Sequence, residues 1–349
     1  MSAQMSMIFE TNDLSVASPA TVSRCGMVYM EPESLGNGPL IMSWLLTVPP
    51  AMALKSKVKL QEMFDRFLEP SLTFLRRFLD EIALTIDNNL TQSLMRIMDC
   101  FLNSYQPKEG VPPPAAEEIE RLHVAIEPYF LFSLVWSVGV TTNAAGRTAF
   151  DGFIRDTMAE HGCEKLFPSA GLVYDYKFHA ESSKWVTWMS DQEPFEYNSK
   201  LTFNECVVPT KDSVRNKFLL DKLLTNGKHV LAVGSTGTGK TVNIMDYLQS
   251  EMDDTYVPLT LSFSARTGAH QTQNILDSKM EKRKRGVYGP TAGKQFIIYI
   301  DDFNMPQKEE YGAQPPLELV RQSLSQGGWY DLKALSFRKI IDRTFVTSM

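Results

Sequence analysis

Apolar residues recur at helical spacing through much of the first third of the chain. One stripe consists of Leu72, Leu75, Leu79, Ile82 and Ile86, and a second of Leu90, Leu94, Ile97 and Phe101. Steps of three and four residues place such side chains on one face of an α-helix. The pattern predicts amphipathic helices between residues 40 and 105, whose stripes serve packing rather than chemistry.

The pattern changes twice between residues 106 and 200. Residues 106–116 form a proline-rich connector, and the apolar run 127–138 then predicts a buried helix. That run is too short to span a bilayer. No other apolar run is long enough to predict a transmembrane helix. Trp185 and Trp188 either share a helical face or pack a connector against a neighbouring element.

From about residue 201 the sequence alternates between strand and helix patterns. Strands are predicted at 229–233, 257–263, 296–300 and 344–348, with helical stretches between them. Run 296–300 is apolar throughout, which is typical of a strand buried on both faces of a parallel sheet. At the other end of the chain, residues 7–9 and 27–30 predict two short strands around a loop.

A phosphate-binding loop follows the first of these later strands. Its residues are Gly234-Ser235-Thr236-Gly237-Thr238-Gly239-Lys240-Thr241, which fit the pattern G-x-x-x-x-G-K-[ST] between an apolar strand and a helix. The glycines let backbone N–H groups face a polyphosphate at a helix N-terminus. Lys240 is then expected to reach the outer phosphates, and the Thr241 hydroxyl to hold Mg²⁺.

Two acids end the apolar run 296–300. Asp301 and Asp302 follow it directly, at the edge of a parallel sheet where ligands gather. We expect Asp301 to contact Mg²⁺, directly or through water, and Asp302 to orient or deprotonate the attacking water. The alternative is a pair of acids that only cap a turn before Pro306.

Composition adds limits rather than a function. The chain has 349 residues, which predicts two or three domains, and a net charge of −6, which argues against a generally basic nucleic-acid surface. The basic run 282–285 is interpreted as a solvated loop rather than a nucleic-acid or tubulin patch. Four dispersed cysteines predict reduced thiols, with neither a zinc site nor a disulfide framework; they are Cys25, Cys100, Cys163 and Cys206.

Long motifs resemble one family, the dynein heavy chains, and in particular their inner-arm axonemal members. Residues 18–29 resemble the end of the second AAA+ module, 234–241 the Walker A loop of the third, and 301–306 its axonemal Walker B segment. The other matching segments are 127–137, 263–267 and 311–319. The resemblance covers essentially the whole chain.

The resemblance implies an α/β P-loop (AAA+) fold preceded by an all-helical lid, with both modules partial. Residues 1–38 are expected to be the last strands of module two, and 39–145 its helical lid and a connector. Residues 146–200 then extend into module three, whose large subdomain is 201–349, ending before its sensor and lid. The family's strand order is 5-1-4-3-2. It places the strand 344–348 between the strand that precedes the loop and the strand that precedes Asp301.

The resemblance also implies a larger protein: a minus-end-directed microtubule motor of the cytoskeleton, in the axoneme of a cilium or flagellum. Its cofactors are ATP or ADP with Mg²⁺. Its partners are the other AAA+ modules, microtubules through a stalk outside this chain, and dynein intermediate and light chains. Neither a nucleic acid nor a membrane is expected as a partner.

Three further site assignments come from the resemblance. Arg24 is expected to act in trans, as a finger on the γ-phosphate of the preceding module. Asn12 is a weaker candidate for a sensor residue. The segment Val208-Pro209-Thr210 resembles the one that passes the adenine, although it also fits a plain extended start to a helix.

One departure bears on catalysis. Many AAA+ ATPases end Walker B with Asp-Glu, whereas this chain has Asp302 at the second position. Asp is one methylene shorter, and a misplacement of about 1 Å can cost about 10²-fold in rate. We therefore expect ATP binding in a regulatory role with doubtful hydrolysis.

Two rival functions remain at this point. A self-contained P-loop enzyme, such as a small-molecule kinase, needs a lid for its acceptor substrate after the loop, and the long helical region precedes the loop instead. A structural fragment that binds no nucleotide is the other rival.

Overall fold

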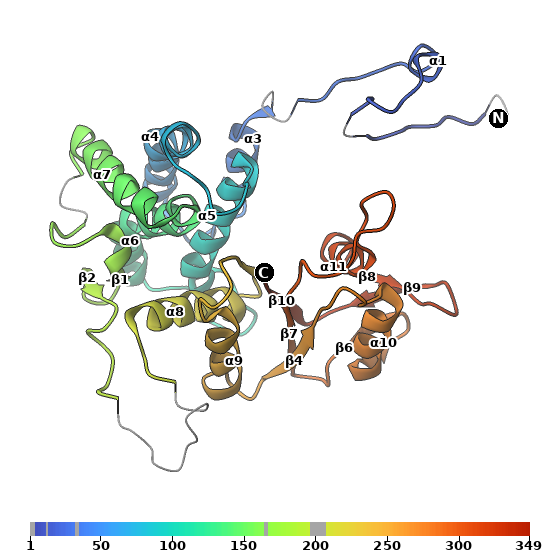
Figure 1. The fold of residues 1–349 in the computed structure, drawn as a ribbon. Helices are drawn as coiled ribbons and strands as arrows, with labels where there is room; N and C mark the ends of the chain where they lie inside the picture. The colour runs from blue at the N-terminus through green and yellow to red at the C-terminus, as the bar shows by residue number, and fades with distance from the viewer. Residues whose placement is uncertain (1–3, 12, 32–34, 164–166, 196–206) are drawn as a thin grey trace.

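The computed structural model describes residues 4–11, 13–31, 35–163, 167–195 and 207–349. Asn12 and Cys206 lie outside these ranges. Two packed regions stand side by side, which we call the helical part (residues 38–190) and the α/β part (residues 207–349) (Figure 1). The N-terminal segment leads away from both and contains the short helix α1 (Pro19–Val22).

The helical part is built from five helices around one apolar core. They are α3 (Gly38–Leu45), α4 (Leu54–Phe78), α5 (Asp87–Leu102), α6 (Ala116–Ser137) and α7 (Ala144–Glu160). Helix α6 supplies the centre, where Phe130 is 0% exposed and meets Phe64 of α4 edge-on with ring centroids 4.9 Å apart. The predicted amphipathic helices and the buried helix at 127–138 are thus present, and that buried helix is longer than its apolar run indicated.

Helix α6 also has the length and composition of a membrane span. The stretch Ala116–Thr141 meets that test, but 78% of its apolar window is buried inside the protein. A helix that is apolar all round belongs either in a membrane or in the core of a folded protein. Here it packs against α4 and α5 and forms the core of the helical part.

The first apolar stripe predicted a helix reaching Ile86, and this was wrong. Helix α4 ends at Phe78, Leu79 is extended, and Ile82 and Ile86 are 49% and 56% exposed. Tertiary contacts override the helical spacing, because the backbone N–H of Ile82 donates to the carbonyl of Thr141, 2.8 Å away. The second stripe, from Leu90, lies on α5 as expected.

The boundary expected at residue 145 does not separate two cores. Helix α7 packs on α4, where Phe153 stacks on Phe74 with centroids 4.2 Å apart. A two-stranded hairpin follows, made of β1 (Tyr176–His179) and β2 (Lys184–Thr187). Trp188, directly after it, is 1% exposed and donates its indole N–H to the carbonyl of Tyr174. The tryptophans therefore pack a connector and share no helical face.

A four-stranded parallel sheet forms the centre of the α/β part. Its strands, in spatial order, are β3 (Val230–Ala232), β10 (Arg343–Ser348), β7 (Gln295–Asp301) and β4 (Tyr256–Ser262). All four predicted strands are confirmed. The expected order is confirmed too, since β10 lies between β3 and β7.

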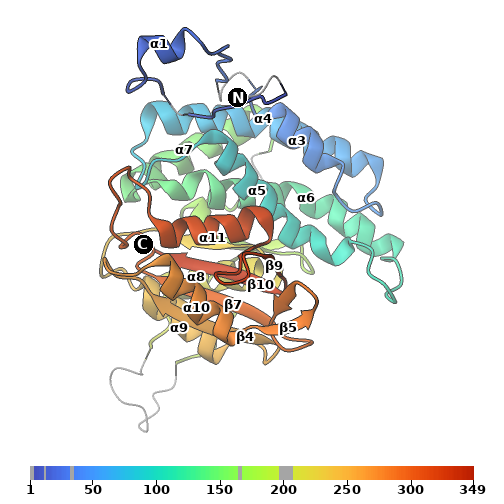
Figure 2. The same cartoon turned by 90° about the vertical axis from the view of Figure 1, so that its right-hand side faces the viewer.

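Helices cover both faces of this sheet (Figure 2). Ile297 and Tyr299 of β7 face α8 (Lys211–Thr225) and α9 (Lys240–Ser250), while Phe296 and Ile298 face α10 (Ala269–Lys279) and α11 (Pro315–Gln326). Successive strand residues point to opposite faces, so an entirely apolar strand needs this double cover. The α/β P-loop fold class is thereby confirmed.

A second sheet of four strands contacts α10 and α11 through its strand β8. Its order is β5 (Glu281–Lys284), β6 (Val287–Gly289), β9 (Phe337–Ile340) and β8 (Gly328–Tyr330). The basic run 282–285, interpreted above as a loop, mostly lies in β5. The run forms a strand because the chain turns at Gly286 and returns as β6, which pairs with β5. Lys282 and Lys284 remain exposed.

The two strands expected near the N-terminus are absent from the described residues there. Ile8 is 96% exposed and Val28 is 85% exposed, in segments without strand pairing. A strand satisfies its backbone only by pairing, so an apolar run without a neighbouring strand stays unpaired. The prediction of two strands at residues 7–9 and 27–30 was therefore wrong for this structure.

Candidate functional site

The predicted phosphate-binding loop connects β3 to α9 at the carboxyl edge of the parallel sheet. Gly237 and Gly239 have φ angles of 82° and 78°, a region that L side chains rarely adopt. Gly239 is the N-cap of α9, and Lys240 is the first residue of that helix. The loop therefore curls over a helix N-terminus, where unpaired N–H groups and the helix dipole attract an anion.

The Lys240 side chain folds back over this loop. Its ammonium donates to the carbonyl oxygens of Gly234 and Ser235, at 2.7 and 2.8 Å. These neutral acceptors are weaker partners for an ammonium than a phosphate oxygen. The lysine is thus held within the loop, beside the place where the phosphates of a nucleotide are expected.

Thr241 and Asp301 meet although they lie 60 positions apart in the sequence. The Thr241 hydroxyl donates to one carboxylate oxygen of Asp301 at 3.0 Å. Thr241 stands in the first turn of α9 and Asp301 ends β7. The helix and the strand, packed together in the sheet, bring both oxygens to the mouth of the loop.

The Thr241 and Asp301 oxygens are too few to hold a metal ion by themselves, but they suit Mg²⁺ that is also bound by phosphates and water. Among the described residues, no cluster of three or more His, Cys, Asp or Glu side chains could hold a metal. Mg²⁺ prefers oxygen ligands and is usually held by one or two protein groups with waters and substrate phosphates. The hydroxyl of Thr241 and the carboxylate of Asp301 match that smaller set.

Two buried hydroxyls beside Asp301 were missed by sequence reasoning. Ser348 donates to the other carboxylate oxygen of Asp301, and the Tyr299 hydroxyl lies 3.0 Å from the Ser348 hydroxyl. Burial raises the pKa of the Asp301 carboxyl, but hydrogen bonds, chiefly those from Ser348 and Thr241, hold that pKa below its ordinary value. Asp301 is therefore ionised at neutral pH.

Asp302 lies in a different environment from its neighbour. It is exposed and has a φ angle of 54°, in the left-handed region that Asp tolerates better than most residues. Its N–H donates to the Asp301 carboxylate at 3.1 Å, and its carbonyl accepts from the N–H of Met305 at 3.0 Å. The backbone turns sharply there, which leaves the Asp302 carboxylate facing solvent.

The remaining predicted site residues are not assembled with the loop. Thr210 is the N-cap of α8, where its hydroxyl accepts from the N–H of Ser213 at 3.2 Å. Val208, two positions before Thr210, is 54% exposed. Arg24 is exposed, in the N-terminal segment that leads away from both parts (Figure 1).

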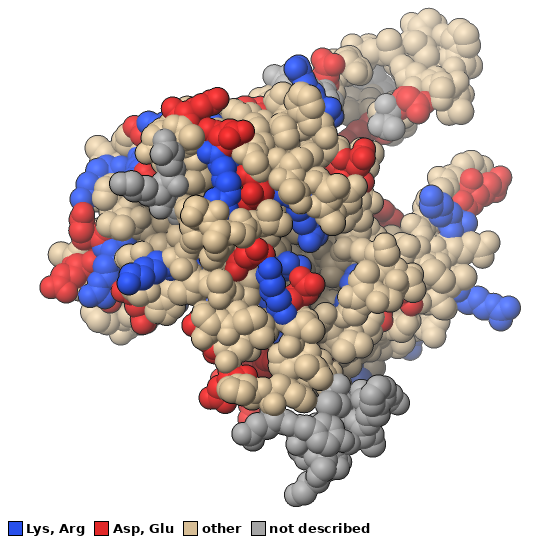
Figure 3. Space-filling model, turned by 60° about the vertical axis from the view of Figure 1, so that its left-hand side comes forward, with Lys and Arg blue, Asp and Glu red and all other residues tan. Residues whose placement is uncertain are grey.

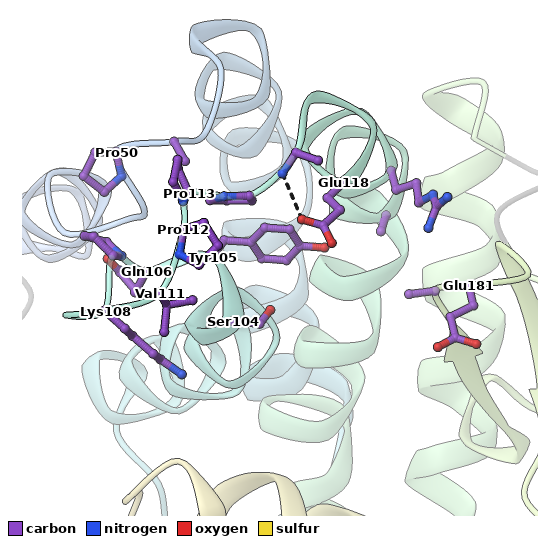
Figure 4. Close-up of a pocket in the computed structure, with 17 residues that line it drawn as sticks. Pro50, Ser104, Tyr105, Gln106, Lys108, Val111, Pro112, Pro113, Glu118 and Glu181 are labelled. Atoms are coloured by element: carbon purple, nitrogen blue, oxygen red, sulfur yellow. Dashed lines mark hydrogen bonds between the residues drawn. The ribbon is translucent and has the colours of Figure 1, made fainter.

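A hollow in the described structure lies away from this loop. It has a volume of about 1230 Å³ and borders the proline-rich connector, with Tyr105, Pro112 and Glu118 among its lining residues (Figure 4). None of its lining residues belongs to the phosphate-binding loop. On the face drawn in Figure 3, basic and acidic side chains are interspersed. Neither the hollow nor that surface changes the assignment of the candidate site.

Comparison with known proteins connects both parts to one family. The family described as "Dynein heavy chain AAA lid domain" matches residues 60–190, and "P-loop containing dynein motor region" matches residues 195–349. Dynein axonemal heavy chain 1 of Homo sapiens is 44% identical over 99% of this chain, which spans 8% of that relative. Dynein axonemal heavy chain 12 of Mus musculus is 39% identical over the whole chain, which spans 12% of it.

Dynein axonemal heavy chain 3 of Homo sapiens is also similar, at 38% identity over the whole chain and 9% of its own length. The chain thus spans about a tenth of the length of the relatives it matches. The resemblance drawn from the motifs is confirmed by these matches and by the strand order of the sheet. The chain belongs to the axonemal dynein heavy chains.

Proposed function

We propose that the α/β part binds ATP with Mg²⁺ and serves as a regulatory nucleotide site of an axonemal dynein motor. The contact between Thr241 and Asp301, 3.0 Å across a gap of 60 residues, carries the proposal. It joins the two halves of a P-loop site that the sequence shows only separately. The dynein P-loop match over residues 195–349 supports the same reading.

The roles of the residues follow from their positions. Backbone N–H groups of residues 234–239 and the Lys240 ammonium bind phosphate oxygens, and the lysine exchanges its two loop carbonyls for charged acceptors. Thr241 and Asp301 hold Mg²⁺, which neutralises phosphate charge when bound. The segment Val208-Pro209-Thr210, which leads into α8, passes the adenine.

Hydrolysis at this site is proposed to be slow. Asp302 is the candidate to orient the attacking water, but its carboxylate is short and its backbone is left-handed. Lengthening it by Asp302→Glu is expected to raise turnover at this site, measured as phosphate release with the preceding site disabled. Unchanged or lower turnover would show that another element limits the rate.

The parent protein is proposed to be a microtubule motor of the ciliary or flagellar axoneme. Residues 1–38 and 39–145 are assigned to the end and the lid of one AAA+ module, residues 146–200 to an extension into the next, and residues 201–349 to that next module. Arg24 is proposed to act on the module before them. Other modules, microtubules, and intermediate and light chains are its partners. In the full heavy chain, Arg24→Ala is expected to slow ATP turnover while ATP binding through Lys240 persists.

The direct test is ATP binding to the chain by calorimetry with Mg²⁺ present. Lys240→Ala is expected to weaken binding about 100-fold or more, because it removes charge-assisted bonds worth about 1.5–3 kcal/mol each. Lys282→Ala, an equal change at an exposed site on β5, is the matched control and leaves affinity unchanged. Equal affinity of wild type and Lys240→Ala would refute the proposal and leave the structural-fragment reading.

The kinase alternative is tested with the same protein. Phosphoryl transfer from ATP to an added small-molecule acceptor, rather than to water, would favour an independent enzyme. We expect no acceptor-dependent turnover, because no lid for an acceptor follows the loop within the described residues.

A further inference from the structure

Two hydroxyl groups lie behind the carboxylate of Asp301 and have no role in the proposed function so far. Tyr299 and Ser348 are both 0% exposed, on the neighbouring parallel strands β7 and β10. Buried hydroxyls need partners, because an unpaired polar group away from water costs free energy. Here the partners are each other and Asp301.

The strand register explains why these three side chains meet. Thr347 pairs with Ile300, so the next positions along the two strands bring Ser348 beside Asp301. Tyr299 and Asp301 are two positions apart on one strand and therefore point to the same face of the sheet. That face carries α9, whose first turn presents Thr241.

The direction of each hydrogen bond can be deduced from the donors available. An ionised carboxylate only accepts, so both Ser348 and Thr241 donate to Asp301, one to each of its oxygens. A serine has a single proton, so in the contact with Tyr299 the serine oxygen accepts and the tyrosine donates. The donors run in one sequence, from Tyr299 to Ser348 to Asp301.

This arrangement leaves the Thr241 oxygen with its lone pairs free. The Thr241 hydroxyl donates its proton to Asp301, so the Thr241 oxygen can face a cation at the mouth of the loop. The orientation of the carboxylate decides where that proton points, and Ser348 fixes the orientation from the buried side. Partners of this kind are known to govern metal affinity by orienting the groups that ligate.

We propose that Ser348 and Tyr299 are positioning residues that orient Asp301 and Thr241 for Mg²⁺, and so make tight ATP binding depend on that ion. The inference rests on the proposed function, since it needs a site that binds ATP. Ser348 acts directly on Asp301, and Tyr299 acts through Ser348. Neither residue touches the nucleotide.

The test compares ATP affinity with Mg²⁺ and with EDTA in its place, by calorimetry on the chain. In Ser348→Ala the ratio of the two affinities is expected to fall about 10- to 100-fold, the usual effect of losing an outer partner of a metal ligand. Tyr299→Phe is expected to lower the ratio less, because Ser348 still donates to Asp301. Affinity in EDTA stays at the wild-type value in both variants.

The control is Ser133→Ala, a serine in α6 that is also 0% exposed and donates to the carbonyl of Tyr129. It makes the same chemical change in a buried position far along the chain from the site, and we expect the ratio to stay unchanged. If Ser348→Ala does not fold, Tyr299→Phe carries the test, because it keeps the ring and removes only the hydroxyl.

The outcomes separate the two proposals. Wild-type ratios in both variants, with ATP binding still abolished by Lys240→Ala, would overturn the positioning role and leave the ATP site intact. A loss of affinity in EDTA equal to the loss in Mg²⁺ would also overturn it, since it indicates a general disturbance of the loop. Absence of ATP binding by wild-type protein would overturn both proposals together.

Discussion

The helical part and the α/β part use buried side chains for different purposes. In the helical part, buried side chains form a core enclosed by helices. Phe130, Leu131 and Leu134 of α6 are 0% exposed there. In the α/β part, burial stops at the carboxyl edge of the sheet. Ile300 is 0% exposed, whereas Asp302, two positions later, is exposed.

The difference has a geometric origin. A helix satisfies its own backbone, so its apolar stripe can be covered by neighbours along its whole length. Parallel strands all end at one edge, where loops and helix N-termini leave polar groups without partners in the same element. Substitutions in the helical part are therefore expected to change stability, and those at the edge to change binding.

The largest effect on stability is expected from Phe130→Ala. It removes a ring from the centre of the helical core and leaves a cavity, which costs about 3–5 kcal/mol. Urea unfolding followed by circular dichroism measures the loss, with Leu84→Ala as control, since Leu84 is 96% exposed. A loss below about 1 kcal/mol would indicate that this core is not close-packed.

The junction between the two parts is the next place to test the comparison. Asp99 of α5 accepts from the Trp44 indole at 2.8 Å and from the Lys228 ammonium at 2.6 Å, just before β3. Asp99→Ala is expected to cost about 1–2 kcal/mol, because it leaves two donors unpaired at a partly exposed site.

Asp99→Asn is the matched variant, since its amide oxygen still accepts from Trp44. ATP affinity is expected to stay at the wild-type value in both. A fall in affinity that tracks the loss of stability would break the separation of roles, by showing that the helical part acts on the loop through Lys228.

The same glycine substitution is expected to have opposite signs in the two parts. Gly237→Ala places a side chain at a φ angle of 82° and costs about 1–2 kcal/mol, whereas Gly152→Ala in α7 gains about 0.5–1 kcal/mol. An added Cβ meets nothing within 4 Å at either position, so only backbone preference differs. Thermal unfolding of the two variants measures both effects, and equal signs would contradict the strain assigned to the loop.

The smallest effect concerns pH. Burial, with nearby Arg343 and Arg96, lowers the pKa of His229 to about 4, and its Nδ1 accepts the N–H of Phe345 at 3.0 Å. The unfolded chain binds this proton from about pH 6.5 downward while the folded chain resists it, so stability falls as pH drops from 6.5 toward 4.

His229 is exposed to solvent, which screens the effect, and we expect a change of less than about 1 kcal/mol. His229→Gln keeps an acceptor and does not titrate, so it should remove this part of the slope. Urea unfolding between pH 4 and 7 compares the two proteins. Identical slopes would show that His229 does not contribute.

The local pattern predicted a strand correctly where a neighbouring strand pairs with the run. The run 296–300 became β7 because β10 and β4 pair with it on both sides. The runs at 7–9 and 27–30 had a similar apolar character and formed no strand, because no strand pairs with them. Helical spacing likewise continued past Phe78, where a contact to Thr141 ended α4.

The family and the phosphate-binding loop could be recognised from the sequence, because each is carried by residues that are contiguous in a motif, and the strand order followed from the family resemblance. Only the tertiary structure decided what surrounds Asp301. Ser348 lies 47 positions from Asp301, and nothing in its local sequence marks it. Parallel pairing of β7 with β10 brings the two side chains together, and parallel strands are joined by long crossover connections, so residues that pair lie far apart in the sequence.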